Sequence, residues 1–230
     1  MNGDSLADPL RHALNSAHAH FAIGHAPARR YPPEVAPFAV IDDISEPTLM
    51  RLRELLTPGE LIYIFNEPPA QMDRLSVGPP LHTFQMLGPE VGAVVETREG
   101  EISPILMTPD DAGEMFELIT QAFPGFYQPR TYEMGTYYGI RVDGKLVAMA
   151  GERLCMTGYR ELSGVCTHPG YVGKGYARTL MIRLMGDHAA AGIKSFLHVG
   201  KANTRAVAIY ERMGFQVLRS IALWPISRVR

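Results

Sequence analysis

Residues 165–177 read Val-Cys-Thr-His-Pro-Gly-Tyr-Val-Gly-Lys-Gly-Tyr-Ala. A predicted strand ends at Pro169, the glycines Gly170, Gly173 and Gly175 follow it closely, and a long predicted helix begins directly after them. Glycines let a backbone turn its N–H groups toward one point, and a helix N-terminus adds a partial positive charge there. The pattern predicts a phosphate-binding turn that needs no basic side chain. A merely tight strand-to-helix turn is the alternative interpretation.

The spacing of these glycines distinguishes the predicted turn from two common types of phosphate-binding loop. Gly170-x-x-Gly173-x-Gly175 differs from the GxGxxG pattern of dinucleotide-binding folds. It also differs from a P-loop, because Gly175 stands where a serine or threonine would follow Lys174. An ATP-binding loop is therefore disfavoured.

The chain around this turn alternates predicted helices and strands. Thr108 can cap a helix that begins at Pro109, and Asp143-Gly144 between two apolar runs predicts a hairpin. The predicted elements are a helix, a three-strand meander, a helix, a strand, a helix and a strand, at 108–122, 137–142, 145–156, 159–167, 173–190, 195–199, 203–213 and 215–223. This order predicts an α+β or mixed α/β fold, antiparallel at first and parallel across the helical crossover.

The first hundred residues differ in composition from the rest. Twelve of the 18 prolines precede residue 90, and all four lysines follow residue 144. Predicted helices at 5–15 and 47–56 and strand-like runs at 18–23, 37–41, 61–65 and 83–87 indicate a small, loop-rich α/β unit. We therefore expect two parts, 1–100 and 101–230. The first carries no chemical motif, and the spacing of its histidines (His12, His18, His20 and His25) matches no metal site.

Composition restricts the expected partners and compartment. A formal net charge of −2 gives no general attraction for nucleic acid or an anionic membrane. No segment approaches the ~20 apolar residues of a membrane span, and the N-terminus lacks the pattern of a secretory signal. The two cysteines, Cys155 and Cys166, fit a reducing compartment. We expect a cytoplasmic protein with no metal and with no nucleic-acid or membrane partner.

Two motifs resemble the GNAT superfamily of N-acetyltransferases. Val165-x-Thr167-x-Pro169 followed by Gly173-x-Gly175-Tyr176-Ala177 is similar to its acetyl-CoA motif. The second motif, Asn203-x-x-Ala206-x-x-Ile209-Tyr210-Glu211-x-x-Gly214-Phe215, begins 28 residues after Gly175. The resemblance covers roughly residues 101–230 and is closest to the branch related to glycine N-acyltransferase-like proteins. It implies a mixed sheet flanked by helices and splayed between its fourth and fifth strands, with acetyl-CoA in the gap. One interpretation of residues 1–100 is a degenerate copy of the same fold, walling the acceptor pocket.

The resemblance also implies roles for individual residues. The main chain of Val165 and Thr167, with Cys166 between them, would pair with the pantetheine arm, and Asn203 would hydrogen-bond that arm or simply cap a helix. The pyrophosphate cradle would comprise Val172, Gly173, Lys174, Gly175, Tyr176 and Ala177. Val172 departs from the family, which commonly has arginine there. Tyr210 would be the general acid; the alternative is that it belongs to the apolar stripe of its helix.

The general base is sought among carboxylates of the meander. If Thr157-Gly158 is a two-residue turn, Met156 pairs with Tyr159 and Glu152 pairs with Ser163. Glu152 and Glu161 then lie near each other on one face, which would raise one of their pKa values and suit a base. A bulge in the third strand, which is common in splayed sheets, would break this register. The resemblance ranks Glu161 before Glu152, and a surface role for both is the alternative. The same register sets Cys166 opposite Met149, so we expect no disulfide.

We therefore expect an N-acyltransferase that moves an acetyl group from acetyl-CoA to a primary amine by direct attack. A non-catalytic acyl-CoA-binding or interaction module is the alternative; it would keep the glycine turn and Asn203 but turn over no amine. The sequence does not identify the amine acceptor. A final strand exposed as far as Leu223-Trp224-Pro225 would allow a homodimer.

Overall fold

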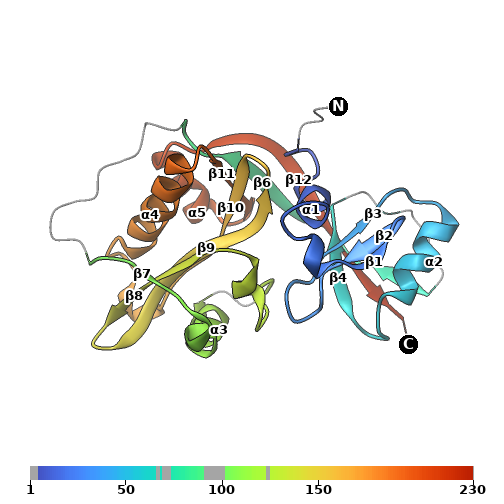
Figure 1. Ribbon diagram of the computed structural model, residues 1–230, viewed down its shortest axis with the longest axis horizontal. Coiled ribbons are helices and arrows are strands. Elements are labelled where there is room, and N and C mark those ends of the chain that lie inside the picture. Colours follow the sequence, from blue (N-terminus) through green and yellow to red (C-terminus); the bar gives the residue numbers. More distant parts are fainter. Residues whose placement is uncertain (1–4, 66–67, 69–73, 91–101, 123–124, 230) are drawn as a thin grey trace.

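The computed structural model describes residues 5–65, 68, 74–90, 102–122 and 125–229. Its centre is a mixed sheet of nine strands in the order β4-β12-β6-β11-β10-β9-β8-β7, with β5 pairing with β12 as well. A second, three-stranded sheet has the order β1-β2-β3. Figure 1 shows the small sheet at one end of the molecule and the helices α3, α4 and α5 at the other. No helix in the described part of the chain is both long and apolar enough to cross a membrane.

The predicted meander is present with the predicted bounds. It consists of β8 (Tyr137–Val142), β9 (Lys145–Met156) and β10 (Tyr159–Thr167). Asp143 and Gly144 both have positive φ, as a tight hairpin turn requires, and Gly158 does as well. The edge strand β7 (Ile105–Leu106), which pairs with β8, was not predicted.

The pairing of β9 with β10 corrects one expectation. Tyr159 lies opposite Met156 and Cys166 opposite Met149, as predicted, but Glu152 lies opposite Leu162 rather than Ser163. A register shift between Arg160 and Leu162 causes the difference. A second shift between Ser163 and Cys166, where Gly164 has a φ of 61°, restores the predicted pairing of Cys166 with Met149. Bulges of this kind change which side chains face which side of the sheet.

The predicted splay lies between β10 and β11 (Lys194–Gly200). These parallel strands pair only where Tyr159–Glu161 meets Lys194–Phe196. On its other edge, β11 pairs with β6 (Leu81–Leu87) from Phe196 to Gly200. The strands β10 and β11 therefore separate after Glu161, and the β10 backbone from Leu162 onward has no strand partner on that side among the described residues.

Helices cover both faces of the sheet. The helices α4 (Tyr176–Ala190) and α5 (Thr204–Arg212) pack on the face that carries Ala148 and Ala150. The helix α3 (Ala112–Ala122), preceded by the 3-10 turn η2 (Pro109–Asp111), packs on the opposite face with Met149 and Cys166. The short turns η3 (Thr131–Met134) and η4 (Pro169–Tyr171) lead into β8 and α4 (Figure 1).

The first hundred residues contribute to both sheets. Their elements are α1 (Pro9–Leu14), η1 (Ala19–Phe21), β1 (Ile23–His25), β2 (Ala28–Arg30), β3 (Ala39–Ile41), α2 (Glu46–Glu54), β4 (Leu61–Ile64), β5 (Leu75–Val77) and β6. The strand predicted at 18–23 is wrong, because His18 turns its ring inward at a 3-10 turn. The strand β6 lies in the main sheet between β11 and β12, so this sheet joins strands from both sides of residue 100.

The last strand, β12 (Gln216–Arg228), pairs with different strands along its length. Its first part pairs with β6, and Trp224 to Ser227 pair with β4. Residues Ile226 to Arg228 also pair with β5. Gln216 to Leu223 pair with β6 alone among the described strands, so the homodimer expected on this strand stays a prediction.

Candidate active site

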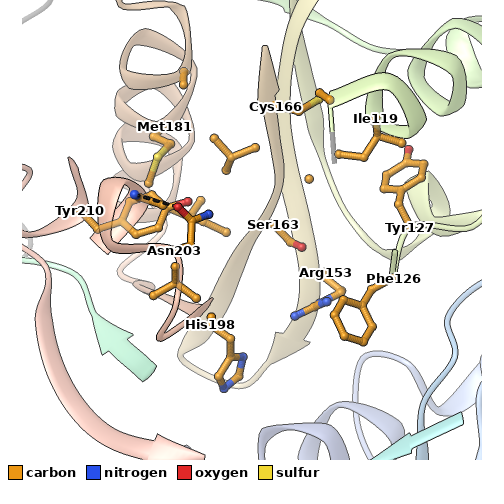
Figure 2. Close-up of a pocket in the computed structure, with 18 of the residues that line it drawn as sticks. Ile119, Phe126, Tyr127, Arg153, Ser163, Cys166, Met181, His198, Asn203 and Tyr210 are labelled. Atoms are coloured by element: carbon orange, nitrogen blue, oxygen red, sulfur yellow. Dashed lines mark hydrogen bonds between the residues drawn. The ribbon is translucent and has the colours of Figure 1, made fainter. Parts of the chain in front are cut away.

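A cavity of about 400 Å³ opens at the splay. Side chains from both faces of the sheet line it (Figure 2). On the α4 and α5 side these include Val172, Ala177, Met181, Asn203, Arg205, Ala206, Ile209 and Tyr210. On the other side they include Ile119, Ala122, Phe126, Tyr127, Thr131, Arg153, Cys166, His198 and Leu223. The cavity therefore connects the two faces where β10 and β11 separate.

The glycine turn lies at one end of this cavity, next to Val172 and Ala177. Gly173 and Gly175 have φ values of 84° and 85°, which glycine adopts without strain. A Cβ at either position would meet no atom within 4 Å, so the space in front of the turn is open. Gly175 is the N-cap of α4, a helix of 15 residues. Open N–H groups at the start of a long helix fit a pyrophosphate, as the sequence predicts.

Side chains around the turn hold it rather than fill it. His168 accepts a hydrogen bond at Nδ1 from the backbone N–H of Gly170, at 3.1 Å. The Lys174 ammonium lies 5.0 Å from the centre of the Tyr171 ring. The sequence did not single out His168, although a histidine directly before a Pro-Gly pair suits this capping role.

Asn203 both caps α5 and faces the cavity. Its Oδ1 accepts a hydrogen bond from the N–H of Ala206 at 3.1 Å. This bond leaves the Nδ2 amide group available to a ligand, so capping and ligand binding are compatible.

Tyr210 lies on the cavity side of α5. Its ring packs against Phe215, 6.0 Å away between centroids, and burial raises the pKa of the phenol to about 12. No residue of α5 is fully buried, so the apolar stripe that contains Tyr210 is only half-buried. The hydroxyl therefore keeps its proton at neutral pH and borders the cavity.

The two candidate carboxylates lie on opposite faces of the sheet, and neither lines the cavity. Glu161 accepts hydrogen bonds from Arg153 Nε at 2.9 Å and Nη2 at 2.5 Å, and its Oε1 lies 2.8 Å from His198 Nδ1. Burial alone would raise the pKa of Glu161, but the charges of Arg153 and His198 and their hydrogen bonds lower it to about 2.

Glu152 faces α4 instead. Its Oε1 lies 2.7 Å from His188 Nε2, and its Oε2 accepts a hydrogen bond from the N–H of Thr136. Burial opposes ionisation, but these hydrogen bonds lower the pKa of Glu152 below its ordinary value. The expected pair of adjacent carboxylates with one raised pKa is therefore wrong, because the bulged register separates them.

Cys166 lines the cavity on the α3 side. Burial raises the pKa of its thiol to about 12, so the sulfur is protonated and is no nucleophile at neutral pH. Both cysteines are free.

The sequence did not predict the polar residues on the α3 side of the cavity. Arg153, Ser163 and His198 line it, together with the aromatic rings of Phe126 and Tyr127. The only available signal was their position in strands near the splay. The predicted register paired Ser163 with Glu152, whereas Ser163 lies opposite Gly151.

Known proteins share this fold. Residues 107–215 match the family model described as the acetyltransferase (GNAT) family. A GNAT-family protein from Novosphingobium aromaticivorans has 28% identity and a TM-score of 0.88, covering 99% of this chain and 100% of that one. A GCN5-related N-acetyltransferase from Kribbella flavida has the same fold, with 14% identity and a TM-score of 0.64 over 99% of this chain and 96% of that one. No curated protein matches the chain.

The fold, the splayed sheet and the matched segment point to one class of protein. Over residues 107–215 this chain is similar to the acetyltransferase (GNAT) family, and over nearly its whole length it has the fold of a GNAT-family protein, which supports an acyltransferase. Its placement in the branch related to glycine N-acyltransferase-like proteins stays a prediction.

Proposed function

We propose that the chain transfers an acetyl group from acetyl-CoA to a primary amine. The observation that carries the proposal is the cavity, which runs from the glycine turn through the splay to the opposite face. A cofactor arm entering from α4 can thereby meet an acceptor entering from the α3 side. A module that only binds acyl-CoA would need no opening to the second face.

Residues of the turn and of β10 hold the cosubstrate in this proposal. The N–H groups from Val172 to Ala177 bind the pyrophosphate, and Asn203 Nδ2 binds the arm. The β10 main chain at Val165 and Thr167, which lacks a strand partner on its β11 side, pairs with the arm like an added strand. When bound, acetyl-CoA supplies a thioester whose carbonyl carbon an unprotonated amine attacks, and its C–S bond breaks as the amide forms.

The chain supplies a proton and an oriented site. Tyr210 Oη is protonated at neutral pH and can give that proton to the departing sulfur. A free β10 N–H near Val165 can polarise the carbonyl oxygen. We assign Glu161 a positioning role, because it holds Arg153 and His198 at the cavity wall and is itself fully buried. The amine then loses its proton to solvent before it attacks.

Release of free thiol from acetyl-CoA, followed across a broad library of amines, tests the proposal. We expect turnover with at least one amine and coenzyme A binding in its absence. Coenzyme A binding without turnover of any amine would favour the non-catalytic module.

A further inference from the structure

The α3 side of the cavity presents an arginine whose hydrogen bonds are incomplete. Glu161 engages Arg153 through Nε and Nη2. A guanidinium has five N–H donors, so Nη1 and one N–H of Nη2 remain for a further partner. Nη1 has no hydrogen-bond partner among the described residues, and Figure 2 shows the head group pointing into the cavity.

Other side chains of this wall fit a carboxylate next to Arg153. Figure 2 shows the Ser163 hydroxyl directed toward the cavity near the guanidinium, and no hydrogen bond of this hydroxyl to a described residue is present. The Phe126 ring lies beside Arg153. The Tyr127 hydroxyl is buried without a hydrogen-bond partner in the described part of the chain. The α3 side of the cavity thus offers hydrogen-bond donors within an otherwise aromatic surface. This combination suits a ligand that carries an anionic group on an apolar skeleton.

The charges around the cavity exclude the opposite kind of acceptor. No aspartate or glutamate among the described residues lines it, whereas Arg153 and Arg205 do. Glu161 is 0% exposed and already bonded to Arg153, so it offers no surface to a ligand. A polyamine or another polycation would find arginines and no accessible carboxylate among the described residues of the cavity wall.

We infer that the acceptor is an amine that also carries a carboxylate, which binds Arg153 with the help of Ser163 on the α3 side of the cavity. Its amino group then points toward the splay and Tyr210, which Figure 2 shows on the opposite side of the cavity. This inference rests on the proposed function and specifies its substrate class.

Matched amines test it. Phenylalanine, 3-amino-3-phenylpropionate and 4-aminobutyrate are each compared with the corresponding primary amide, with rates expressed per concentration of free amine. We expect kcat/KM for at least one acid to exceed that of its amide by tenfold or more. Amides equal to or better than all three acids would overturn the inference while leaving the acetyltransfer itself intact.

Two variants test whether Arg153 and Ser163 cause the preference for an acid over its amide. Arg153→Gln alone leaves Glu161 buried without its partner, so the double variant Arg153→Gln with Glu161→Gln keeps the charges balanced. In this variant the acid-to-amide ratio should fall toward one, and in Ser163→Ala it should fall severalfold. An unchanged ratio in a folded double variant would contradict the role of Arg153.

A binding measurement separates this inference from the proposed function. 3-Phenylpropionate and 4-methylvalerate, carboxylates without an amino group, are titrated into the protein saturated with coenzyme A. Binding in the wild type that weakens tenfold or more in the double variant supports the carboxylate site even if no amine turns over. Absence of binding by both carboxylates, together with turnover of amides, would disprove the site and keep the acetyltransferase.

Discussion

At the scale of single residues, some side chains of the candidate site could be predicted from the sequence and others could not. Asn203 and Tyr210 were singled out by the resemblance of their motif to the GNAT superfamily, and both line the cavity. Arg153 and Ser163 could not be predicted, because a register shift between Arg160 and Leu162 changes the pairing of β9 with β10 and no local sequence pattern marks where it falls. The resemblance singled out Glu161 as the base, and its role in the site stays a prediction. Its burial under Arg153 and His198 was not predictable from its neighbours in sequence.

Tyr210→Phe tests the general acid. The variant keeps the ring that packs against Phe215 but loses the proton, so kcat should fall by ~10² to 10⁴. Coenzyme A affinity and melting temperature should change little, since no described residue bonds to the hydroxyl. Steady-state kinetics and calorimetry measure both. Wild-type turnover in a folded variant would show that the proton comes from elsewhere.

Glu161→Gln distinguishes a positioning residue from a base. If Glu161 holds Arg153 and His198 in place, activity should fall by roughly ten- to a hundredfold, by the same factor at every pH. A base would instead give a loss at pH 7 that recovers at high pH, where free amine accumulates. Rate profiles from pH 6 to pH 10 separate the two roles, and Glu152→Gln serves as the comparison.

At the scale of elements, the turn before α4 and the sheet around it were predictable to different degrees. The turn follows from local chemistry, because glycines at positive φ before a helix have few alternatives. The meander follows from its hairpin dipeptides. The position of β6 does not, because a strand of alternating residues carries no information about distant partners.

Gly175→Val should weaken coenzyme A binding by at least tenfold. The residue has a φ of 85°, which a β-branched side chain adopts only with strain of about 1–2 kcal/mol, so the cradle would deform. Gly186→Ala is the matched control: it lies inside α4 with room for a Cβ and should leave binding unchanged. Isothermal calorimetry measures the coenzyme A affinity of both variants. Equal affinities in Gly175→Val and Gly186→Ala would show that the turn does not bind the phosphates.

His18 links η1 to η3 and makes the stability depend on pH. It lies 2.9 Å from the Tyr31 hydroxyl and 2.9 Å from the Met134 carbonyl oxygen, and burial lowers its pKa to about 4. Between pH 6.5 and 4 the unfolded chain therefore binds a proton that the folded chain does not, so stability falls as the pH falls. We expect a loss of about 2 kcal/mol between pH 7 and pH 5.

Urea unfolding of the wild type and His18→Gln at both pH values measures this contribution. The variant cannot titrate at this position, so its loss between pH 7 and pH 5 should be smaller by the same amount. Equal losses in the two proteins would mean that His18 protonates as readily in the folded state.

At the scale of the whole molecule, composition suggested a boundary near residue 100, but the main sheet has strands from both sides of it. Thr83 to Leu87 of β6 pair with β11 on one side and β12 on the other. We therefore propose that the two parts form one cooperative unit, although their compositions differ.

A fragment of residues 101–230 tests this unity. Without β6, the strands β11 and β12 would face each other across a missing strand, so the fragment should show no cooperative thermal transition and no coenzyme A binding. Circular dichroism and calorimetry measure both properties against the full chain. A fragment that melts cooperatively and binds coenzyme A would establish residues 101–230 as an independent domain.

The place of β12 also bears on how the chain is made. During synthesis, residues 81–87 leave the ribosome long before residues 216–228. The strand β6, which residues 81–87 form, therefore lacks its neighbour β12 until the last residues emerge. Domains generally fold as they leave the ribosome, but this sheet closes only with its C-terminal strand, and such long-range pairing slows folding. Until then the nascent chain exposes unpaired strand edges, so premature termination near the C-terminus would yield an aggregation-prone product rather than a shorter enzyme.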